Sequence, residues 1–347
     1  MSVKEPLVSI IILNYNAGEL LFNCIKSIKK SNYSNVEIIV VDNVSSDNSH
    51  IKCKEKYQEI KLIQNKENFG YCGGNNIGIK EAKGEFIVIL NPDTIVESNC
   101  IEELIFAHNK FGDGLYQPKI LSLNEENIIQ STGNMLHIFG FGFARDKGNK
   151  ISDKNEEIEK IGYASGTCLF TSRKVLEKVG LLDEFLFLYH DDLDLGWRAA
   201  QIGISSFYVP KSKIFHVESY SLKWSAKKFF WLERNRKYCL LTHYSKDTYK
   251  KMRFSLILVD LFVWVFYFSK GFLGAKIKAE SEIRKNKENI EKKYQELESR
   301  KIISDKELIK HFPDEIFVPT NVSQESMNQT FNSILTRLSK KVKKKIK

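Results

Sequence analysis

Residues 8–16 read VSIIILNYN, an apolar run that ends in three polar side chains. An unbroken run of β-branched and aliphatic residues of this length is typical of a strand buried on both faces. Similar runs follow at residues 36–41, 60–63 and 86–90. These four segments are predicted to be parallel strands of one sheet.

The segments between these runs have helical length and period, at residues 17–30, 46–57 and 73–83. Strands that alternate with helices predict a doubly wound, mostly parallel sheet flanked by helices. Further strands are expected near residues 115–121, 168–171 and 206–209, with helices from Asp191 and over 224–244.

Short amide and carboxylate side chains follow all four predicted strands: Asn14 to Asn16, Asp42 with Asn43, Asn65 to Asn68, and Asn91 to Asp93. In open α/β sheets ligands bind along the carboxyl edge of the strands. The pattern indicates a binding edge, and ordinary turn chemistry is the alternative.

The C-terminal third changes in composition. Residues 254–268 are an apolar run, short for a membrane span of about 20 residues. We expect five parts: a nucleotide-binding half (1–110), a half carrying the catalytic base (111–244), a helical extension (245–312), a linker (313–330) and a basic amphipathic tail (331–347).

The charge is concentrated at the end of the chain. The net charge is +10, and residues 331–347 hold six lysines, Arg337 and no acid. A nucleic-acid groove would spread its basic residues over a folded face, so we expect no nucleic-acid partner. The tail favours an anionic membrane surface. Six scattered cysteines without a signal peptide favour the cytoplasm.

Two groups of carboxylates are candidates for chemistry. Asp93 follows a strand and a proline, and one or two carboxylates with substrate phosphates suffice to hold Mg²⁺ or Mn²⁺. Asp191, Asp192 and Asp194 crowd four positions, where repulsion raises carboxylate pKa values toward those of a general base. Asp191 would cap a helix and Asp194 would pair with Arg198, leaving Asp192 as the candidate base.

Together these motifs resemble family-2 glycosyltransferases, most closely their rhamnosyltransferase-like branch, over about residues 7–240. The resemblance rests on VSIIILNYN at 8–16, VDN at 41–43, the stretch 68–78, LNPD at 90–93 and DDLD at 191–194. It implies a GT-A fold with a Rossmann-like sheet. It also implies inverting transfer from a nucleoside-diphosphate sugar.

The resemblance also assigns residues to roles. Asp42 would bind the nucleobase, and Asn14, Tyr15, Asn16, Asn68, Gly70, Asn75 and Asn91 would line the nucleotide-sugar pocket. Asp93 matches the last Asp of the family's Asp-x-Asp metal motif, whose first Asp is replaced here by Asn91. Asp192 matches the catalytic base, and Asp191 stands where Glu is more usual. His216 is either a further metal ligand or structural.

Several alternatives stay open from the sequence. Gly70, Gly73, Gly74 and Gly78 either let the donor approach the backbone or let a helix pack closely. Ser165 to Thr167 would line the acceptor side. Residues 254–268 either lie in a bilayer interface or pack inside the protein. The donor implied is a dTDP- or UDP-sugar, with dTDP-rhamnose first, and the acceptor a glycan or lipid-linked glycan in cell-surface polysaccharide synthesis. The rival function is a catalytically inactive sugar-nucleotide-binding scaffold.

Overall fold

The computed structural model describes residues 5–151, 156–217, 225–316 and 325–346. The chain forms two compact units. The first, here called the sheet unit, comprises residues 1–134, 144–196 and 204–220. The second, the helical unit, comprises residues 135–143, 197–203 and 221–347. The expected division near residues 110 and 244 stays a proposal.

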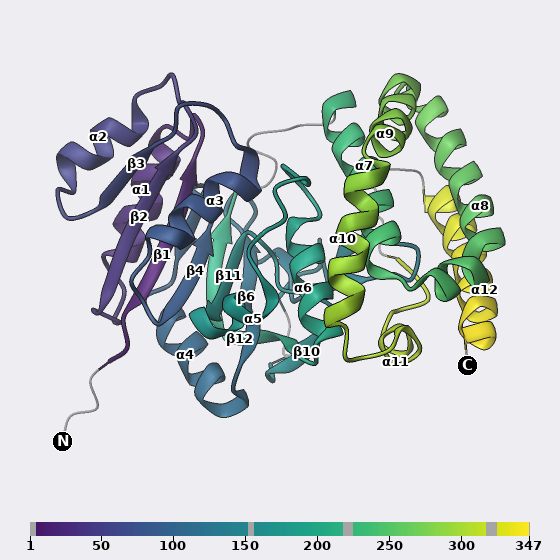
Figure 1. Cartoon of the computed structure of the whole chain (residues 1–347). Helices are drawn as coiled ribbons and strands as arrows, with labels where there is room; N and C mark the ends of the chain where they lie inside the picture. Colours follow the sequence, from purple (N-terminus) through teal and green to yellow (C-terminus); the bar gives the residue numbers. More distant parts are fainter. Residues whose placement is uncertain (1–4, 152–155, 218–224, 317–324, 347) are drawn as a thin grey trace. The chain divides into compact units, whose positions relative to one another are not determined.

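The N-terminal half of the sheet is wholly parallel. Its strands are β1 (Val8–Asn14), β2 (Val36–Asp42), β3 (Lys61–Gln64) and β4 (Phe86–Leu90), in the order β3-β2-β1-β4 (Figure 1). All four predicted strands are confirmed. Because Asn14 lies opposite Asp42 in the register, the polar ends of β1 and β2 are neighbours.

Helices connect these strands as predicted: α1 (Glu19–Ile28), α2 (Ser49–Lys56) and α3 (Gly70–Glu81). Two glycines of α3 allow close packing on the sheet. A Cβ on Gly78 would lie 2.5 Å from Cγ2 of Ile11, and one on Gly74 would lie 2.3 Å from Cδ1 of Leu13. Helix packing therefore accounts for these two glycines.

The other half of the sheet is mixed. Strand β11 (Cys168–Ser172) pairs antiparallel with both β4 and β6 (Gly114–Ser122), and β12 (Ser205–His216) runs parallel to β6. Short strands complete it: β5 (Thr94–Val96), β7 (Ile129–Ser131) and β10 (Glu159–Ile161). The predicted strands near 115–121, 168–171 and 206–209 are confirmed.

Three more helices accompany this sheet: α4 (Cys100–Phe111), α5 (Arg173–Val179) and α6 (Asp191–Gln201). The start of α6 at Asp191 is as predicted. The buried core gathers aliphatic and aromatic residues from both halves of the sheet, including Ile10, Val40, Phe86 and Tyr116. The α/β class with a flanked central sheet is confirmed.

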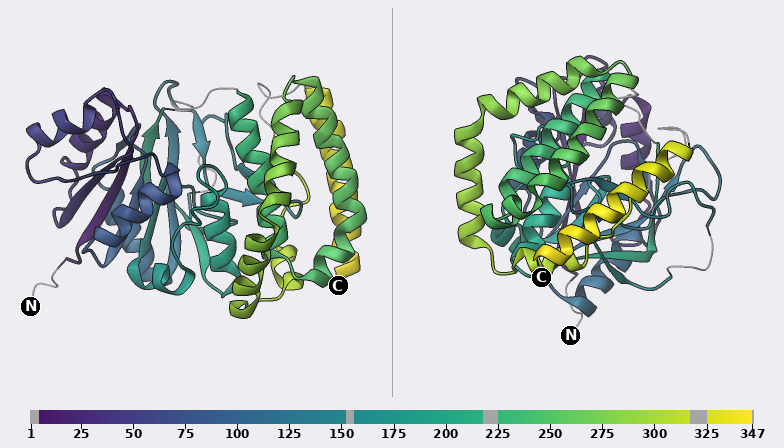
Figure 2. Two further views of the ribbon diagram at one scale, coloured as in Figure 1. Left: turned by 45° about the horizontal axis from the view of Figure 1, so that its top comes forward. Right: turned by 90° about the vertical axis from the view of Figure 1, so that its right-hand side faces the viewer.

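Among its described residues, the helical unit contains six helices and most of the hairpin formed by β8 (Asn134–Leu136) and β9 (Gly142–Ala144). The helices are α7 (Ala226–His243), α8 (Lys246–Ser269), α9 (Leu273–Lys285), α10 (Lys287–Arg300), α11 (Asp305–Lys310) and α12 (Glu325–Ile346). Helices α9 and α10 pack against α7, and α12 packs against α8 and α11 (Figure 2). Helix α12 begins within the segment expected to be a linker.

The C-terminal amphipathic helix uses its apolar face for packing. Leu335, Val342 and Ile346 of α12 are buried, whereas Lys341 and Lys344 are exposed. The sequence predicted the helix correctly. The tertiary structure adds that its apolar side is covered by protein.

A cluster of buried charges joins α7, α8 and α9. The Nζ of Lys276, which is fully buried, lies 2.5 Å from Glu233, 2.6 Å from Asp260 and 2.9 Å from Glu280. Arg236 contacts Glu233 at 2.7 Å. Each of these two buried cations is therefore in contact with at least one carboxylate.

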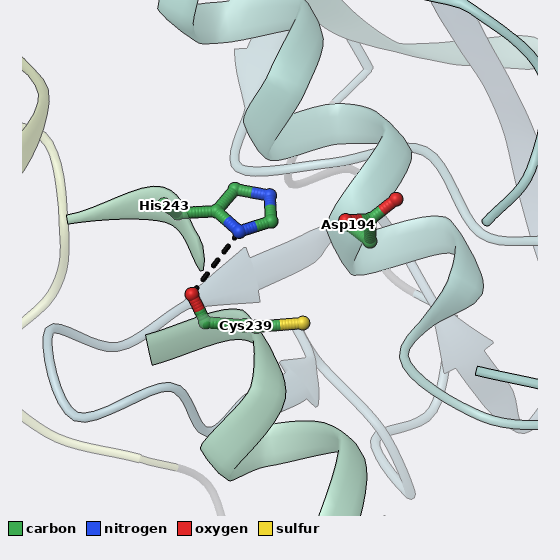
Figure 3. Close-up of side chains that lie close together, drawn as sticks. All are labelled: Asp194, Cys239 and His243. Atoms are coloured by element: carbon green, nitrogen blue, oxygen red, sulfur yellow. Dashed lines mark hydrogen bonds between the residues drawn. The ribbon is translucent and has the colours of Figure 1, made fainter. Parts of the chain in front are cut away.

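Helix α7 ends in a histidine whose ring bonds within the helix. The Nδ1 of His243 donates to the carbonyl of Cys239 at 3.1 Å (Figure 3). Cys239 is buried and reduced, like the other five cysteines.

Candidate active site

Asp93 and His216 come together although they are far apart in sequence. Strand β5 pairs antiparallel with the end of β12, and this register sets His216 opposite Thr94. The Nε2 of His216 consequently lies 3.4 Å from Oδ2 of Asp93. Both side chains are largely buried. The structure thus brings together the two residues predicted as metal ligands.

Gln130 holds the other nitrogen of this histidine. The Nε2 of Gln130 donates to the backbone carbonyl of His216 at 2.9 Å. The Oε1 of Gln130 is therefore left to accept from the Nδ1 of His216 at 2.7 Å. A neutral imidazole with a protonated Nδ1 has a bare Nε2. In that tautomer the Nε2 lone pair faces the Asp93 carboxylate, and a divalent cation held by both groups would relieve the repulsion between them.

The acidic cluster at the start of α6 is buried. Burial, then the neighbouring Asp192 charge, raises the pKa of Asp191 well above its ordinary value. Burial also raises the pKa of Asp192. Two adjacent buried carboxylates cannot both ionise easily, so the pair retains a proton to higher pH than a free aspartate.

Backbone N–H groups bond to both carboxylates, and those on Asp192 include one from the separate turn at Gly166. Asp192 accepts hydrogen bonds from the backbone N–H groups of Gly166 at 3.1 Å and Leu193 at 2.8 Å. These bonds favour its ionised form and oppose the effect of burial. The negative charge of the pair is therefore better accommodated on Asp192, the predicted base.

The turn before α6 has an unusual backbone. Phe187, Tyr189 and His190 all have positive φ angles, of 60°, 67° and 61°. Residues with side chains seldom adopt this conformation, and such strain is concentrated at functional sites. The turn presents Asp191 and Asp192 at the first turn of α6.

Helix α3 meets this turn at its N-terminus. The carbonyl of Phe187 accepts from the N–H of Tyr71 at 2.6 Å, and a Cβ on Gly70 would lie 2.5 Å from that carbonyl. Gly70 also has a φ of 70°. Its place in the donor pocket stays a prediction. Its positive φ and its close approach to the Phe187 carbonyl require glycine at this position.

Tyr71 and Gly166 connect α3 to the acidic pair. The Tyr71 hydroxyl donates to the carbonyl of Gly166, whose own N–H donates to Asp192. One residue further on, the carbonyl of Thr167 accepts from the N–H of Asn91 at 3.0 Å. The turn 165–167 thus lies between the Asn91 to Asp93 turn and Asp192.

The predicted nucleobase ligands form an internal network. Asp42 Oδ1 accepts from Nδ2 of Asn14 at 2.8 Å and lies 3.3 Å from Nδ1 of His50. Asp42 Oδ2 accepts from the N–H of Ser45 at 2.9 Å. Asn14 and Asp42 are almost fully buried. Asn14 therefore orients the Asp42 carboxylate.

Next to this network two residues are more accessible. The ring of Tyr15 is 49% exposed, and Asn16 has a φ of 54°. Asn16 accepts from the N–H of Ser46 at 2.8 Å, which joins the end of β1 to the loop after β2.

Asn43 extends the same edge toward α3. It donates to Asn68 Oδ1 at 3.2 Å and to the carbonyl of Gly70 at 2.9 Å, and it accepts from Asn65 at 2.8 Å. Asn75, one turn into α3, donates to the carbonyl of Tyr71 at 2.9 Å. Its buried Oδ1 has no hydrogen-bond partner among the residues that the structure describes.

Residues 9–180 match the family model described as glycosyl transferase family 2. The chain contains a family 2 glycosyltransferase domain. The match runs from β1 to the end of α5 and includes Asp42 and Asp93, whereas Asp192 and His216 lie beyond it. The family predicted from the sequence motifs is confirmed.

Curated relatives support this assignment. The chain is 29% identical over 204 residues to a low-salt glycan biosynthesis hexosyltransferase of Haloferax volcanii, covering 57% of this chain and 62% of that protein. It is 24% identical over 238 residues to an N-acetylglucosaminyl-diphospho-decaprenol L-rhamnosyltransferase of Mycobacterium tuberculosis, covering 61% and 76%.

A third relative is a UDP-Glc:alpha-D-GlcNAc-diphosphoundecaprenol beta-1,3-glucosyltransferase of Escherichia coli. The chain is 40% identical to it over 101 residues, which cover 29% of this chain and 40% of that protein. The chain therefore spans less than two-thirds of the length of the Haloferax and Escherichia relatives.

Solved structures share the fold at low sequence identity. GalNAc-T7 with UDP, GalNAc and Mn²⁺ aligns with a TM-score of 0.59 and 18% identity, covering 73% of this chain and 51% of that chain. TarS residues 1–349 of S. aureus with UDP-GlcNAc align with a TM-score of 0.51 and 16% identity, covering 97% and 90%. The GT-A fold is confirmed.

The sequence alone did not single out several residues of this site. Gln130 lies in a segment without a motif, and His50 lies inside a predicted helix. Tyr71 lies in the stretch 68–78, where the sequence pattern singles out the asparagines and glycines. No local pattern distinguishes these three residues, because their roles depend on partners that are distant along the chain. Gly166 lay in a turn expected to line the acceptor side, and its N–H bonds to the predicted base.

Proposed function

We infer that this chain is an inverting, metal-dependent glycosyltransferase. It would transfer a hexose from a nucleoside-diphosphate sugar to a glycan or lipid-linked acceptor in cell-surface polysaccharide synthesis. The observation that carries this proposal is the pair Asp93 and His216, whose carboxylate oxygen and imidazole Nε2 lie 3.4 Å apart. The buried acidic pair on α6 supplies the base.

The donor atoms of this pair fit a divalent cation. A carboxylate oxygen and an imidazole nitrogen suit Mn²⁺, and Mg²⁺ accepts one carboxylate together with substrate phosphates. A bound ion would stabilise the charge that develops on the leaving diphosphate. Asn91 replaces a charged ligand, so it offers at most a neutral contact.

Asp192 would act on the acceptor. Its ionised carboxylate would remove the proton from the acceptor hydroxyl as the oxygen attacks the anomeric carbon on the face opposite the diphosphate, which inverts that centre. Asp191 would hold the proton that the buried pair retains.

The nucleotide end of the pocket would be formed by Asp42, Asn14, Tyr15 and Asn16. The pocket would continue through Asn68, Gly70 and Asn75.

The relatives suggest substrates and a location. One is named as a rhamnosyltransferase and another as a glucosyltransferase, and both names include a polyprenyl diphosphate acceptor. We therefore place dTDP-rhamnose first and UDP-hexoses second as donors, with a lipid-linked acceptor. Such an acceptor fits a cytoplasmic enzyme held peripherally at the inner face of the cell membrane.

A donor panel tests the proposal. Release of nucleoside diphosphate is measured with dTDP- and UDP-sugars, Mg²⁺ or Mn²⁺, and a lipid-linked acceptor. Asp192→Asn is expected to bind donor normally and to lose transfer by about 10²–10⁴-fold, because it lacks the base. Asp93→Ala is expected to lose metal-dependent donor binding, and the exposed Asp247→Ala serves as the control.

Two outcomes would contradict this assignment. Unchanged turnover of Asp192→Asn would remove its role as base. Tight donor binding by the wild-type chain without release from any donor would favour the inactive scaffold.

A further inference from the structure

Helix α8 exposes an apolar stripe along one side. Phe254, Ile257, Leu261, Val265 and Phe268 are exposed by 59%, 51%, 55%, 65% and 72%. Their spacing of three or four residues places them on one helical face. Exposed apolar surfaces of this extent mark sites of interaction. We call these five residues the α8 stripe.

The opposite side of α8 is part of the protein interior. Met252, Val259, Val263 and Tyr267 are buried. Asp260, at the middle of the helix, lies 2.6 Å from the buried Nζ of Lys276. Within the described residues α8 is the one helix long and apolar enough to cross a membrane, and 33% of its apolar window is buried. Crossing would separate Asp260 from Lys276 or carry both charges into hydrocarbon.

Basic residues border the stripe. Lys250, Lys251 and Arg253 are exposed in the N-terminal half of α8. The Nζ of Lys341, on the neighbouring helix α12, lies 5.7 Å from the ring centroid of Phe254. Since the apolar side of α12 is buried, this helix contributes lysines to the surface. Apolar residues and cations therefore lie on adjacent helices.

We propose that the α8 stripe lies in the plane of an anionic bilayer surface, at the boundary between headgroups and acyl chains. The exposed lysines of α12 contact the headgroups. Large apolar side chains flanked by Lys and Arg fit this boundary. A second copy of this chain is a poorer occupant, because it would bring two lysine-rich edges together. This contact with a bilayer rests on the proposed function, because it would hold the enzyme where a lipid-linked acceptor resides.

Flotation with vesicles tests the inference on the full-length chain. The wild-type chain is expected to float with phosphatidylcholine vesicles that contain phosphatidylglycerol, and less with phosphatidylcholine alone or at high salt. Val265→Asp with Phe268→Asp is expected to reduce binding at least about tenfold, because charges are placed in the apolar boundary. Ile302→Asp, an exposed apolar position outside α8, is the matched control.

Parallel measurements separate the possible failures. Both substitutions are at exposed sites, and unchanged thermal unfolding checks that the fold is intact. Donor turnover with a water-soluble acceptor should be unchanged, so loss of docking and failure of the proposed activity give different results. Neutralising the exposed lysines 340, 341, 344 and 345 to Gln should remove the preference for anionic vesicles.

Three results would overturn the inference. The first is equal vesicle binding by the wild type and the stripe variant, and the second is no vesicle binding by the wild type. The third is resistance of the bound protein to alkaline carbonate extraction, which would indicate a span. A concentration-dependent dimer that the stripe variant abolishes, without vesicle binding, would assign the stripe to a second copy.

Discussion

At the scale of single residues, Gln130 sets the orientation of the His216 ring. The Nδ1 and the backbone carbonyl of His216 are both bonded to Gln130, so the ring cannot turn without breaking the Nδ1 hydrogen bond to a side chain that the carbonyl bond holds in place. This arrangement keeps Nε2 directed at Asp93. Partners of this kind fix both the tautomer and the orientation of a ligating histidine.

Gln130→Leu is expected to weaken Mn²⁺ binding about 10–100-fold, because His216 loses the acceptor for Nδ1–H. Titration calorimetry of Mn²⁺ with nucleoside diphosphate present measures the effect. Gln130→Glu retains an acceptor oxygen and should bind Mn²⁺ closer to the wild type. Equal affinity in all three proteins would show that Gln130 has no influence on the site.

The acidic pair on α6 gives a prediction about pH. Because burial raises the pKa of Asp192 above 3.8, transfer should fall as the pH is lowered while an ordinary aspartate is still ionised. Asp191→Asn replaces the carboxyl that would hold the proton of the pair, so the acid limb of the pH–rate profile should stay close to its wild-type position. If Asp191→Asn instead abolishes transfer and Asp192→Asn does not, Asp191 is the base.

At the scale of elements, three helices of the helical unit meet around Lys276. Burial alone would raise the pKa of Glu233, but Arg236 and Lys276 outweigh this effect and lower the pKa to about 2. A carboxylate whose pKa is depressed in the folded state stabilises the fold at pH values above its ordinary pKa of 4.5. This contribution is lost as the pH falls from 4.5 toward 2.

Lys276→Met is expected to lower the free energy of unfolding by about 3–5 kcal/mol, because buried carboxylates lose a shared cation. Urea denaturation near neutral pH measures the loss. Lys285→Met, at an exposed position near the end of the same helix, is the control and should change little. A loss below about 1 kcal/mol would mean that Arg236 and Lys237 hold the cluster without it.

At the scale of the whole molecule, α12 belongs to the fold of the helical unit. Besides its buried apolar side, its Lys343 lies 2.8 Å from Asp314, and its Ser339 donates to the same carboxylate at 2.6 Å. A helix with lysines and leucines at helical spacing can cover either a membrane or a protein. The structure shows that α12 covers protein.

Ending the chain after Ile316 should therefore destabilise the protein by several kcal/mol, because burying one Leu, Ile or Val side chain contributes about 1.5–3 kcal/mol. A lower melting temperature and increased binding of an apolar dye would be measured. Lys340→Gln with Lys344→Gln leaves the buried side intact and should keep the wild-type melting temperature. An unchanged melting temperature after truncation would contradict this role of α12.

The sequence by itself determined the first four strands, the helices between them and the polar strand ends. These features depend on local periodicity and turn chemistry, which neighbouring residues carry. It also identified Asp93, Asp191 and Asp192 as candidates through motifs, and His216 through the resemblance to the family. The beginning of α6 followed from the same local pattern.

Only the tertiary structure decided which distant groups meet. Gln130 reaches His216 because β7 pairs with β6, which is next to β12, and the sequence of either strand does not reveal this pairing. The same holds for the two amphipathic helices: α8 and α12 both have apolar sides, and packing buried that of α12 while leaving the α8 stripe exposed. The local sequence indicates that one face of a helix is apolar. What covers it depends on contacts between residues far apart in the chain.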